Sequence, residues 1–244
     1  MIFRRKTIYK AKSKYGSYKV VDMKYNGRPS RVLFGDQKTA QSGLALDDEP
    51  ELLFDYNQRF LEMMISRQPM QKALIIGGGA GILPTAAYYQ FPTLSIDSIE
   101  IDPLLTQIAY KYFDLPHDHR LQVHAKDGAG YVAKTNQKYD MICLDAFSGY
   151  TIPPHLLKLD TVKHYKQCLK SDGFIAVNFI SEYRPYQKQL AHNMLEIFGK
   201  IFDHVSLYQA DPHEEANEDQ NFILVASNTP ISFDYLQSTE REIY

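Results

Sequence analysis

Residues 74–84, LIIGGGAGILP, decide the fold, because an apolar run ends there in a glycine-rich loop. Glycine has no Cβ, so the backbone at Gly77, Gly79 and Gly81 can approach a ligand closely. A G-x-G-x-G loop between a strand and a helix is typical of nucleotide- and nucleoside-binding α/β folds, although alone it is a weak signal. Ile82 stands where the dinucleotide pattern G-x-G-x-x-G has its last glycine, which disfavours NAD.

The sequence after this loop alternates between strand-like runs and helix-length segments. The runs are KALIIG, LSIDSIEID, LQVHAKDG, YDMICLD and GFIAVNFI. This alternation predicts βαβ units and a mostly parallel sheet. After a helix over about residues 183–198, the runs HVSLYQA and QNFILVAS predict an antiparallel hairpin at the sheet edge. We therefore expect a Rossmann-like nucleoside-binding domain over residues 71–244.

The first 70 residues have a different pattern. In YKVVDMKYNGRPSRVLFGD, two β-rich runs flank Asn26 and Gly27, which accept the positive φ of a tight hairpin turn. We expect a small β domain over residues 1–48. Apolar residues at helical spacing in DDEPELLFDYNQRFLEMMIS predict a connecting helix within residues 49–70.

Composition indicates a globular protein, with 44% hydrophobic residues among 244 and a net charge of -2. Residues 1–31 are basic, with Asp22 as their single acid. We interpret this stretch as a solvated β face, with an RNA- or phosphate-binding arm as the alternative, and do not expect a nucleic-acid partner. No apolar run approaches the ~20 residues of a membrane span, so we expect a cytoplasmic protein without membrane contact. Cys143 and Cys168 lie in apolar and helical patterns and are expected to be reduced core residues.

Acidic residues follow the second, third and fourth strand-like runs of the α/β domain. Glu100 lies 23 positions after Gly77 at the end of its run, where an acid can accept both hydroxyls of a ribose. Asp127 and Asp145 end the next two runs. Each acid alone could simply cap a helix, but the carboxyl ends of parallel strands meet at one edge of a sheet. We therefore expect these three carboxylates to share one crevice.

The histidines do not indicate a metal site. PHDHRLQVH brings three of them close in sequence without a second ligand group at a known metal spacing, so we expect no metal.

Together, the motifs ALIIGGGAG, IDSIEIDP, VHAKDGAGYV, YDMICLDAF, CLKSDGFIAV and NFILVAS resemble those of the polyamine aminopropyltransferases, which include spermidine synthase, and of their methyltransferase-like relatives. The resemblance covers most of the chain. It implies a seven-stranded S-adenosylmethionine-dependent methyltransferase fold with a C-terminal β-hairpin. It also implies a transferase of polyamine biosynthesis that uses S-adenosylmethionine or its decarboxylated form with an amine or polyamine-like acceptor.

The resemblance assigns roles to single residues. It implies that Glu100 binds the ribose, that Asp127 with Gly128 contacts the adenine, and that Asp145 is the catalytic acid beside the amine. Gln41 and Tyr56 would reach the donor from the N-terminal side, across a stretch with extra residues relative to the family. Dimerisation through the N-terminal β domain is a further implication of the likeness.

Several departures from the family pattern concern the acceptor. Spermidine synthases read G-G-G-D-G, and their loop Asp pairs with a substrate ammonium, where this chain has Ala80. Ser148 replaces a second Asp, DAFSGYTIPPHLL is one residue longer, and ADPHEEANED stands in place of a Tyr-Pro-rich segment. Ser148 and Tyr150 could line the acceptor pocket, although a loop Tyr more often packs.

These losses favour a reaction other than standard putrescine aminopropylation. The chain is closer to spermidine-synthase-like proteins that read LDAFS…IP…HLL. S-adenosylmethionine-dependent methyl transfer and a catalytically silent nucleoside- or RNA-binding protein stay open as alternatives.

Overall fold

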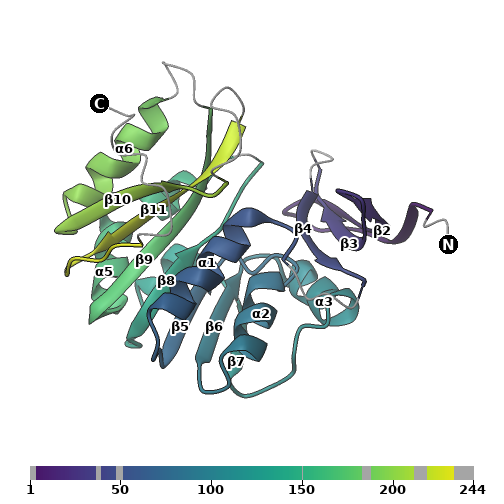
Figure 1. Cartoon of the computed structure of the whole chain (residues 1–244), viewed down its shortest axis with the longest axis horizontal. Coiled ribbons are helices and arrows are strands. Elements are labelled where there is room, and N and C mark those ends of the chain that lie inside the picture. Colours follow the sequence, from purple (N-terminus) through teal and green to yellow (C-terminus); the bar gives the residue numbers. More distant parts are fainter. Residues whose placement is uncertain are drawn as a thin grey trace.

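The computed structural model describes residues 4–36, 40–47, 52–149, 151–182, 188–211 and 219–233. Its strands form two sheets, an antiparallel four-stranded one and a mostly parallel seven-stranded one (Figure 1). Segments 183–187 and 212–218 lie outside the described residues. Among the described residues, no helix has the length and hydropathy needed to cross a membrane.

The four-stranded sheet is an N-terminal meander in the order β1-β2-β3-β4, and all neighbouring strands are antiparallel. Asn26 and Gly27 have φ values of 47° and 85° and form the predicted turn between β2 and β3. The hairpin is thus confirmed, and two further strands extend it. The strands are β1 (Lys6–Lys12), β2 (Ser17–Tyr25), β3 (Arg28–Phe34) and β4 (Ala40–Ala45).

The helix predicted within residues 49–70 is α1 (Asp55–Ser66). It buries Phe60, Met63 and Met64 completely. Their i, i+3, i+4 spacing gives the helix one apolar face, and this face packs into the core of the α/β body.

The α/β body follows the predicted alternation. Its sheet has the order β10-β11-β9-β8-β5-β6-β7. β11 runs antiparallel to both of its neighbours, β10 and β9, and the strands from β9 to β7 are parallel to one another. The predicted parallel strands and the edge hairpin are confirmed. The elements are β5 (Lys72–Ile76), α2 (Ile82–Gln90), β6 (Ser95–Glu100), α3 (Pro103–Tyr112), β7 (Leu121–Ala125), α4 (Gly128–Val132), β8 (Tyr139–Leu144), η1 (Pro154–Leu157), α5 (Leu159–Cys168), β9 (Leu169–Glu182), α6 (Lys188–Gly199), β10 (His204–Gln209) and β11 (Asp219–Ser227).

The central strands are continuous apolar runs because both faces of the sheet are covered. Ile75 of β5 packs in one cluster with residues of α1 and α2. Its neighbours Leu74 and Ile76 face the opposite side, where α5 and α6 pack. Successive side chains alternate between the two faces, so each strand contributes to both cores.

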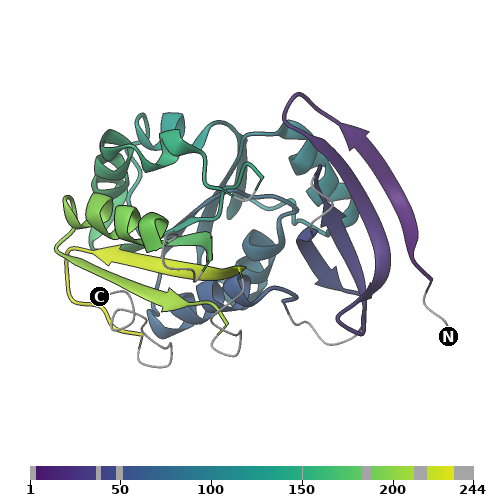
Figure 2. The same ribbon diagram turned by 90° about the horizontal axis from the view of Figure 1, so that it is seen from above.

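The N-terminal sheet stands beside α3 at one end of the molecule (Figures 1 and 2). Tyr18 and Leu33 of the sheet share an apolar cluster with Ile108 of α3. Two hydrogen bonds also join the sheet to the two ends of α3. Ser13 Oγ donates to Asp102 Oδ2 over 2.5 Å, and Arg31 Nη1 donates to the Tyr112 carbonyl over 3.0 Å. These contacts fix how the sheet faces the glycine loop.

One strand differs in length from the prediction. β9 begins at Leu169 rather than at Gly173, because Leu169 pairs with Tyr139 of β8 before a shift in register. The predicted last long helix is α6, and the predicted start of this helix lies outside the described residues. Cys143 and Cys168 are buried free thiols.

Candidate active site

The glycine loop lies between the ends of β6 and β8. The Gly77 amide donates to the Ile99 carbonyl of β6 over 2.9 Å. On the other side, a Cβ on Gly77 would lie 2.2 Å from the Asp145 carbonyl oxygen, and the Gly77 φ is +96°. Only glycine meets both conditions without displacing the chain. The loop is therefore locked against the backbone of Asp145.

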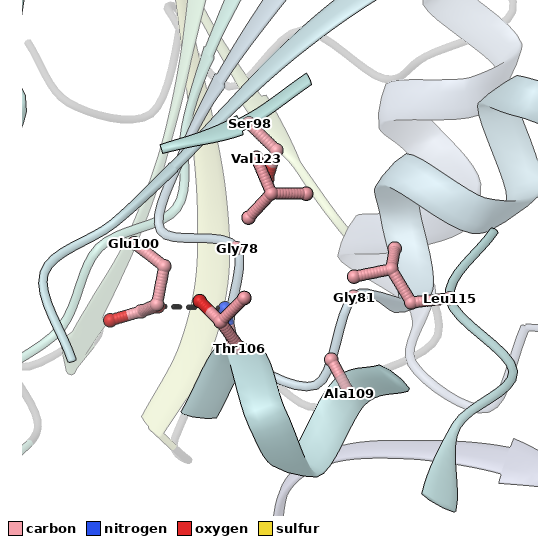
Figure 3. Close-up of a pocket in the computed structure, with 9 residues that line it drawn as sticks. Gly78, Gly81, Ser98, Glu100, Thr106, Ala109, Leu115 and Val123 are labelled. Atoms are coloured by element: carbon pink, nitrogen blue, oxygen red, sulfur yellow. Dashed lines mark hydrogen bonds between the residues drawn. The ribbon is translucent and has the colours of Figure 1, made fainter. Parts of the chain in front are cut away.

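Glu100, at the end of β6, supports the loop through its side chain. Its Oε2 accepts a hydrogen bond from the Gly79 amide over 2.9 Å (Figure 3). Its Oε1 accepts one from the Asp102 amide, also over 2.9 Å. Glu100 is only 8% exposed, and this burial raises the pKa of its carboxyl while the two amide donors lower it. Each carboxylate oxygen can accept a second hydrogen bond. Two ribose hydroxyls would use those remaining positions.

Asp127, just after β7, is held by a helix amide and a histidine. Its Oδ2 caps α4 by accepting from the Gly130 amide over 2.7 Å. Its Oδ1 lies 2.7 Å from His155 Nε2 in η1. Gly128 fits closely beside Ile76, since a Cβ there would lie 2.5 Å from Ile76 Cγ2. The acid predicted to contact adenine is thus oriented from two sides.

Asp145, at the end of β8, faces a buried amide. Its Oδ1 accepts a hydrogen bond from Asn178 Nδ2 of β9 over 2.8 Å. Burial raises the pKa of Asp145 from 3.8 to about 7, and the Asn178 donor opposes this rise. Near neutral pH this carboxyl can therefore both accept and release a proton.

Tyr56 connects the N-terminal side to Asp145. Burial, and after it the charge of Asp145, raise the pKa of the Tyr56 hydroxyl well above 10.0. The same hydroxyl donates to the Gln41 carbonyl over 3.4 Å. The side chain of Gln41 is exposed and lies over Gly35, so it belongs to the rim of the site in this structure. Ser42 of β4 makes the closer approach, because its Oγ is 3.3 Å from where a Cβ on Gly79 would sit.

The residues that depart from the family pattern have different surroundings. Ala80 is 0% exposed and packs in the apolar cluster with Tyr18 and Val20 of the N-terminal sheet. Ser148 is exposed and its backbone bridges to Thr151. Tyr150 lies outside the described residues, as does most of the acidic segment after Asp211.

A small pocket opens between the glycine loop, α3 and the strands β6 and β7 (Figure 3). Its volume is about 10 Å³, which is room for a water molecule, so an adenosine does not fit inside it. The pocket is lined by Gly78, Gly79, Gly81, Ser98, Glu100, Thr106, Ala109, Leu115 and Val123. The three acids lie at the carboxyl ends of β6, β7 and β8, and the glycine loop follows β5, which lies between β6 and β8. Among the described residues, no cluster of three or more His, Cys, Asp or Glu side chains could hold a metal ion.

Sequence reasoning missed Ser42, His155 and Asn178, and also Asn221, whose Nδ2 donates to Asn178 Oδ1. Asn178 carries a detectable signal, because it is a polar residue inside the apolar run FIAVNFI. His155 follows a proline pair without any such contrast, and its partner Asp127 is 28 positions away. No local pattern indicates a contact of that kind.

Comparison with known proteins gives a family model and several relatives. The spermine/spermidine synthase domain matches residues 54–233. A polyamine aminopropyltransferase from Vibrio vulnificus is 29% identical over 200 residues, which cover 76% of this chain and 67% of the relative. The human eEF1A lysine and N-terminal methyltransferase is 30% identical over 155 residues, which cover 59% of this chain and 20% of the relative. The match therefore spans about a fifth of that enzyme's length.

Solved structures show the same fold. A probable spermidine synthase from Corynebacterium glutamicum superposes with a TM-score of 0.79 at 19% identity, covering 92% of this chain and 81% of that protein. Human methyltransferase-like protein 13 in complex with SAH superposes with a TM-score of 0.56 at 23% identity, covering 77% and 83%. The relatives of this chain thus include both aminopropyltransferases and methyltransferases.

Proposed function

Because the chain belongs to the spermine/spermidine synthase family, we propose that it transfers an alkyl group from an adenosyl-sulfonium donor to an amine. One observation carries this proposal. Glu100, Asp127 and Asp145 end three of four adjacent strands, and the glycine loop follows the fourth, β5. The human neighbour that contains SAH supports an adenosyl ligand for this type of fold.

In the proposed complex, each acid has a separate task. Glu100 accepts hydrogen bonds from the ribose hydroxyls, and Asp127 accepts one from the exocyclic amine of adenine. The positive charge of the sulfonium makes its substituent carbons electrophilic. The lone pair of the acceptor nitrogen attacks one of these carbons, the carbon–sulfur bond breaks, and its electrons return to sulfur as a neutral thioether.

Asp145 is the residue that we assign to the proton of the amine. An alkylammonium with a pKa near 10.4 has no free lone pair, so a proton must leave before or during attack. A carboxylate whose pKa is raised to about 7 can accept that proton, directly or through a water. The Tyr56 hydroxyl stays neutral at this pH, so it can donate or accept a hydrogen bond but carries no charge to the site.

The substitution at position 80 favours ordinary S-adenosylmethionine as donor. A carboxylate in this loop would repel the α-carboxylate of S-adenosylmethionine and attract the ammonium of its decarboxylated form. Ala80 removes that discrimination. Ser148 likewise lacks the negative charge that a diamine would use, and each such charge-assisted contact contributes about 1.5–3 kcal/mol. The proposed acceptor is therefore an amine other than putrescine.

Two experiments test the proposal. Isothermal titration with S-adenosylmethionine and its decarboxylated form measures donor preference, and we expect the carboxylated donor to bind at least as tightly. Incubation with either donor and a panel of amines then identifies the reaction from its nucleoside product. S-adenosylhomocysteine indicates methyl transfer and methylthioadenosine indicates aminopropyl transfer.

A matched pair of variants controls the binding test. Glu100→Gln removes the charge that holds the ribose and should weaken donor binding at least tenfold. Glu196→Gln changes an exposed helical acid that pairs with Lys200 and should leave binding unchanged. Tighter binding of the decarboxylated donor would refute the donor assignment, and absence of binding by either donor would refute the whole proposal.

A further inference from the structure

A chain of two side-chain amides, one partly and one fully buried, leads from the edge hairpin to Asp145. Asn221 Nδ2 of β11 donates to Asn178 Oδ1 of β9 over 2.8 Å, and Asn178 Nδ2 donates to Asp145 Oδ1 over 2.8 Å. The three side chains thus connect three neighbouring strands in one direction. Asn178 is 0% exposed and stands among apolar neighbours in β9.

The buried amide of Asn178 does not by itself stabilise the fold. Burying a side-chain amide without partners destabilises the folded state, and an aliphatic residue would pack in the same strand without that cost. The Asn178 amide recovers part of this cost only through its two hydrogen bonds. Its position is better explained by what it does to Asp145.

The direction of the chain is fixed by Asn221. Because the Asn178 oxygen accepts from Asn221, the NH₂ group of Asn178 must face Asp145. A donor toward a carboxylate stabilises its charged form, whereas an acceptor there would stabilise the protonated form. Within the described residues, Asn178 provides the one hydrogen bond that the Asp145 side chain accepts.

We propose that Asn178 and Asn221 are positioning residues that hold Asp145 by its Oδ1, keep it ionised, and leave its Oδ2 for the acceptor nitrogen. This inference rests on the role of Asp145 in the proposed function. In the transfer step, the nitrogen forms its bond to carbon, the carbon–sulfur bond breaks, and the nitrogen's proton moves to Oδ2 or to a water beside it. Asn178 and Asn221 themselves exchange no proton.

The electrostatics around Asp145 agree with this role. Burial alone raises the pKa of Asp145, and the Asn178 hydrogen bond lowers it. Among the described residues, the titratable groups whose pKa values respond to the Asp145 charge are Tyr56 of α1 and Cys143 of β8. The pKa values of both are raised well above their ordinary values, so both are neutral when Asp145 titrates. The hydrogen bond from Asn178 is thus the interaction that opposes the effect of burial on the ionisation of Asp145.

The test follows the titration of Asp145 directly. The full chain, labelled with ¹³C in the aspartate carboxyl carbons, is titrated by NMR, and the Asp145 signal is assigned with Asp145→Asn. Asn178→Leu should raise the titration midpoint by about one unit or more, because it removes a charge-assisted hydrogen bond. Asn221→Leu should raise the midpoint by less, since Asn178 remains but is free to turn.

A matched control comes from the same hairpin. Gln209 Nε2 of β10 donates to Gln220 Oε1 over 3.1 Å, so Gln209→Leu removes an amide–amide hydrogen bond that does not reach Asp145. Its midpoint should equal that of the wild type. Unchanged midpoints in Asn178→Leu and Asn221→Leu would overturn the inference, and if Asn178→Leu does not fold, Asn221→Leu decides alone.

The two proposals can fail separately. Donor binding by the wild type tests the proposed function and needs no amide variant. The carboxyl midpoint tests the amide chain and needs neither donor nor acceptor. When an acceptor has been found, the acidic limb of the pH–rate profile should move with the NMR midpoint, while S-adenosylhomocysteine affinity should stay within twofold of wild type.

Discussion

Replacing Gly77 by alanine should displace the backbone at Asp145 in addition to straining the backbone of residue 77 itself. At φ +96° an added Cβ would lie 2.2 Å from the Asp145 carbonyl oxygen, 2.5 Å from its carbon and 2.8 Å from Ala146 Cα. Ordinary contacts begin near 3.4 Å, so the end of β8 must move by about 1 Å. These are backbone atoms, which cannot rotate away.

The magnitude follows from separating the two costs. A positive φ costs a residue with a Cβ about 1–2 kcal/mol. Gly27→Ala has this cost alone, because Gly27 has φ +85° and an added Cβ would meet nothing within 4 Å. Gly77→Ala has the clash in addition, so its free energy of unfolding should fall by at least about 3 kcal/mol. The difference between the variants isolates the contact with Asp145.

Chemical unfolding and titration with S-adenosylhomocysteine measure both effects. Gly27→Ala should bind the nucleoside like the wild type. Gly77→Ala should bind it at least tenfold more weakly, since the loop and Asp145 move together. Turnover should fall further, because a 1 Å misplacement is enough to reduce it about a hundredfold. The reasoning fails if Gly77→Ala loses no more stability than Gly27→Ala and binds the nucleoside equally well.

Three further predictions concern single side chains. Asp145→Asn should abolish transfer. The pKa of Asp145 is about 7 in the folded protein against 3.8 ordinarily, so the folded state binds an extra proton and the wild-type free energy of unfolding falls as the pH rises from about 4 to 7. The variant lacks this fall and should gain up to about 4 kcal/mol of stability over the wild type between pH 4 and pH 8; equal unfolding curves for both proteins at pH 8 would contradict this. His155→Gln should lower affinity for S-adenosylhomocysteine by three- to tenfold with less effect on an inosine analogue, because it loosens the acid that accepts the 6-amino group; titration with both ligands checks it, and equal losses would argue against it. Tyr56→Phe should lower kcat more than donor affinity, since the charge of Asp145 acts on its hydroxyl, and steady-state kinetics with a binding control decide the point.

The parts of the fold that could be predicted depend on local patterns. The strands β5 and β8 and the second half of β9 are apolar runs because both sheet faces are buried there, and Asn26 with Gly27 predicts the type of turn. β1 was not predicted as a strand, since its lysines interrupt the apolar pattern at the sheet edge. Charged side chains on an edge strand oppose further pairing, so the features that protect the edge also conceal the strand.

The candidate site divides in the same way. The strand-end acids could be found because the carboxyl ends of parallel strands meet wherever a βαβ sheet forms. The partners that orient these acids could not, because His155 and Asn178 reach them across 28 and 33 positions. Such contacts depend on strand order and on where η1 packs, and neither has a local signature. Sequence therefore predicts which groups carry charge but not what holds them.

Position 80 connects donor chemistry to the packing of the N-terminal sheet. In this chain Ala80 is fully buried in the apolar cluster that contains Tyr18 and Val20, so the loop is part of the contact with the N-terminal sheet. A carboxylate at this place would lie among apolar side chains at a cost of several kcal/mol unless it were paired. The alanine is consistent with a donor that needs no carboxylate there, and the packed sheet then keeps the loop in the conformation that Glu100 supports.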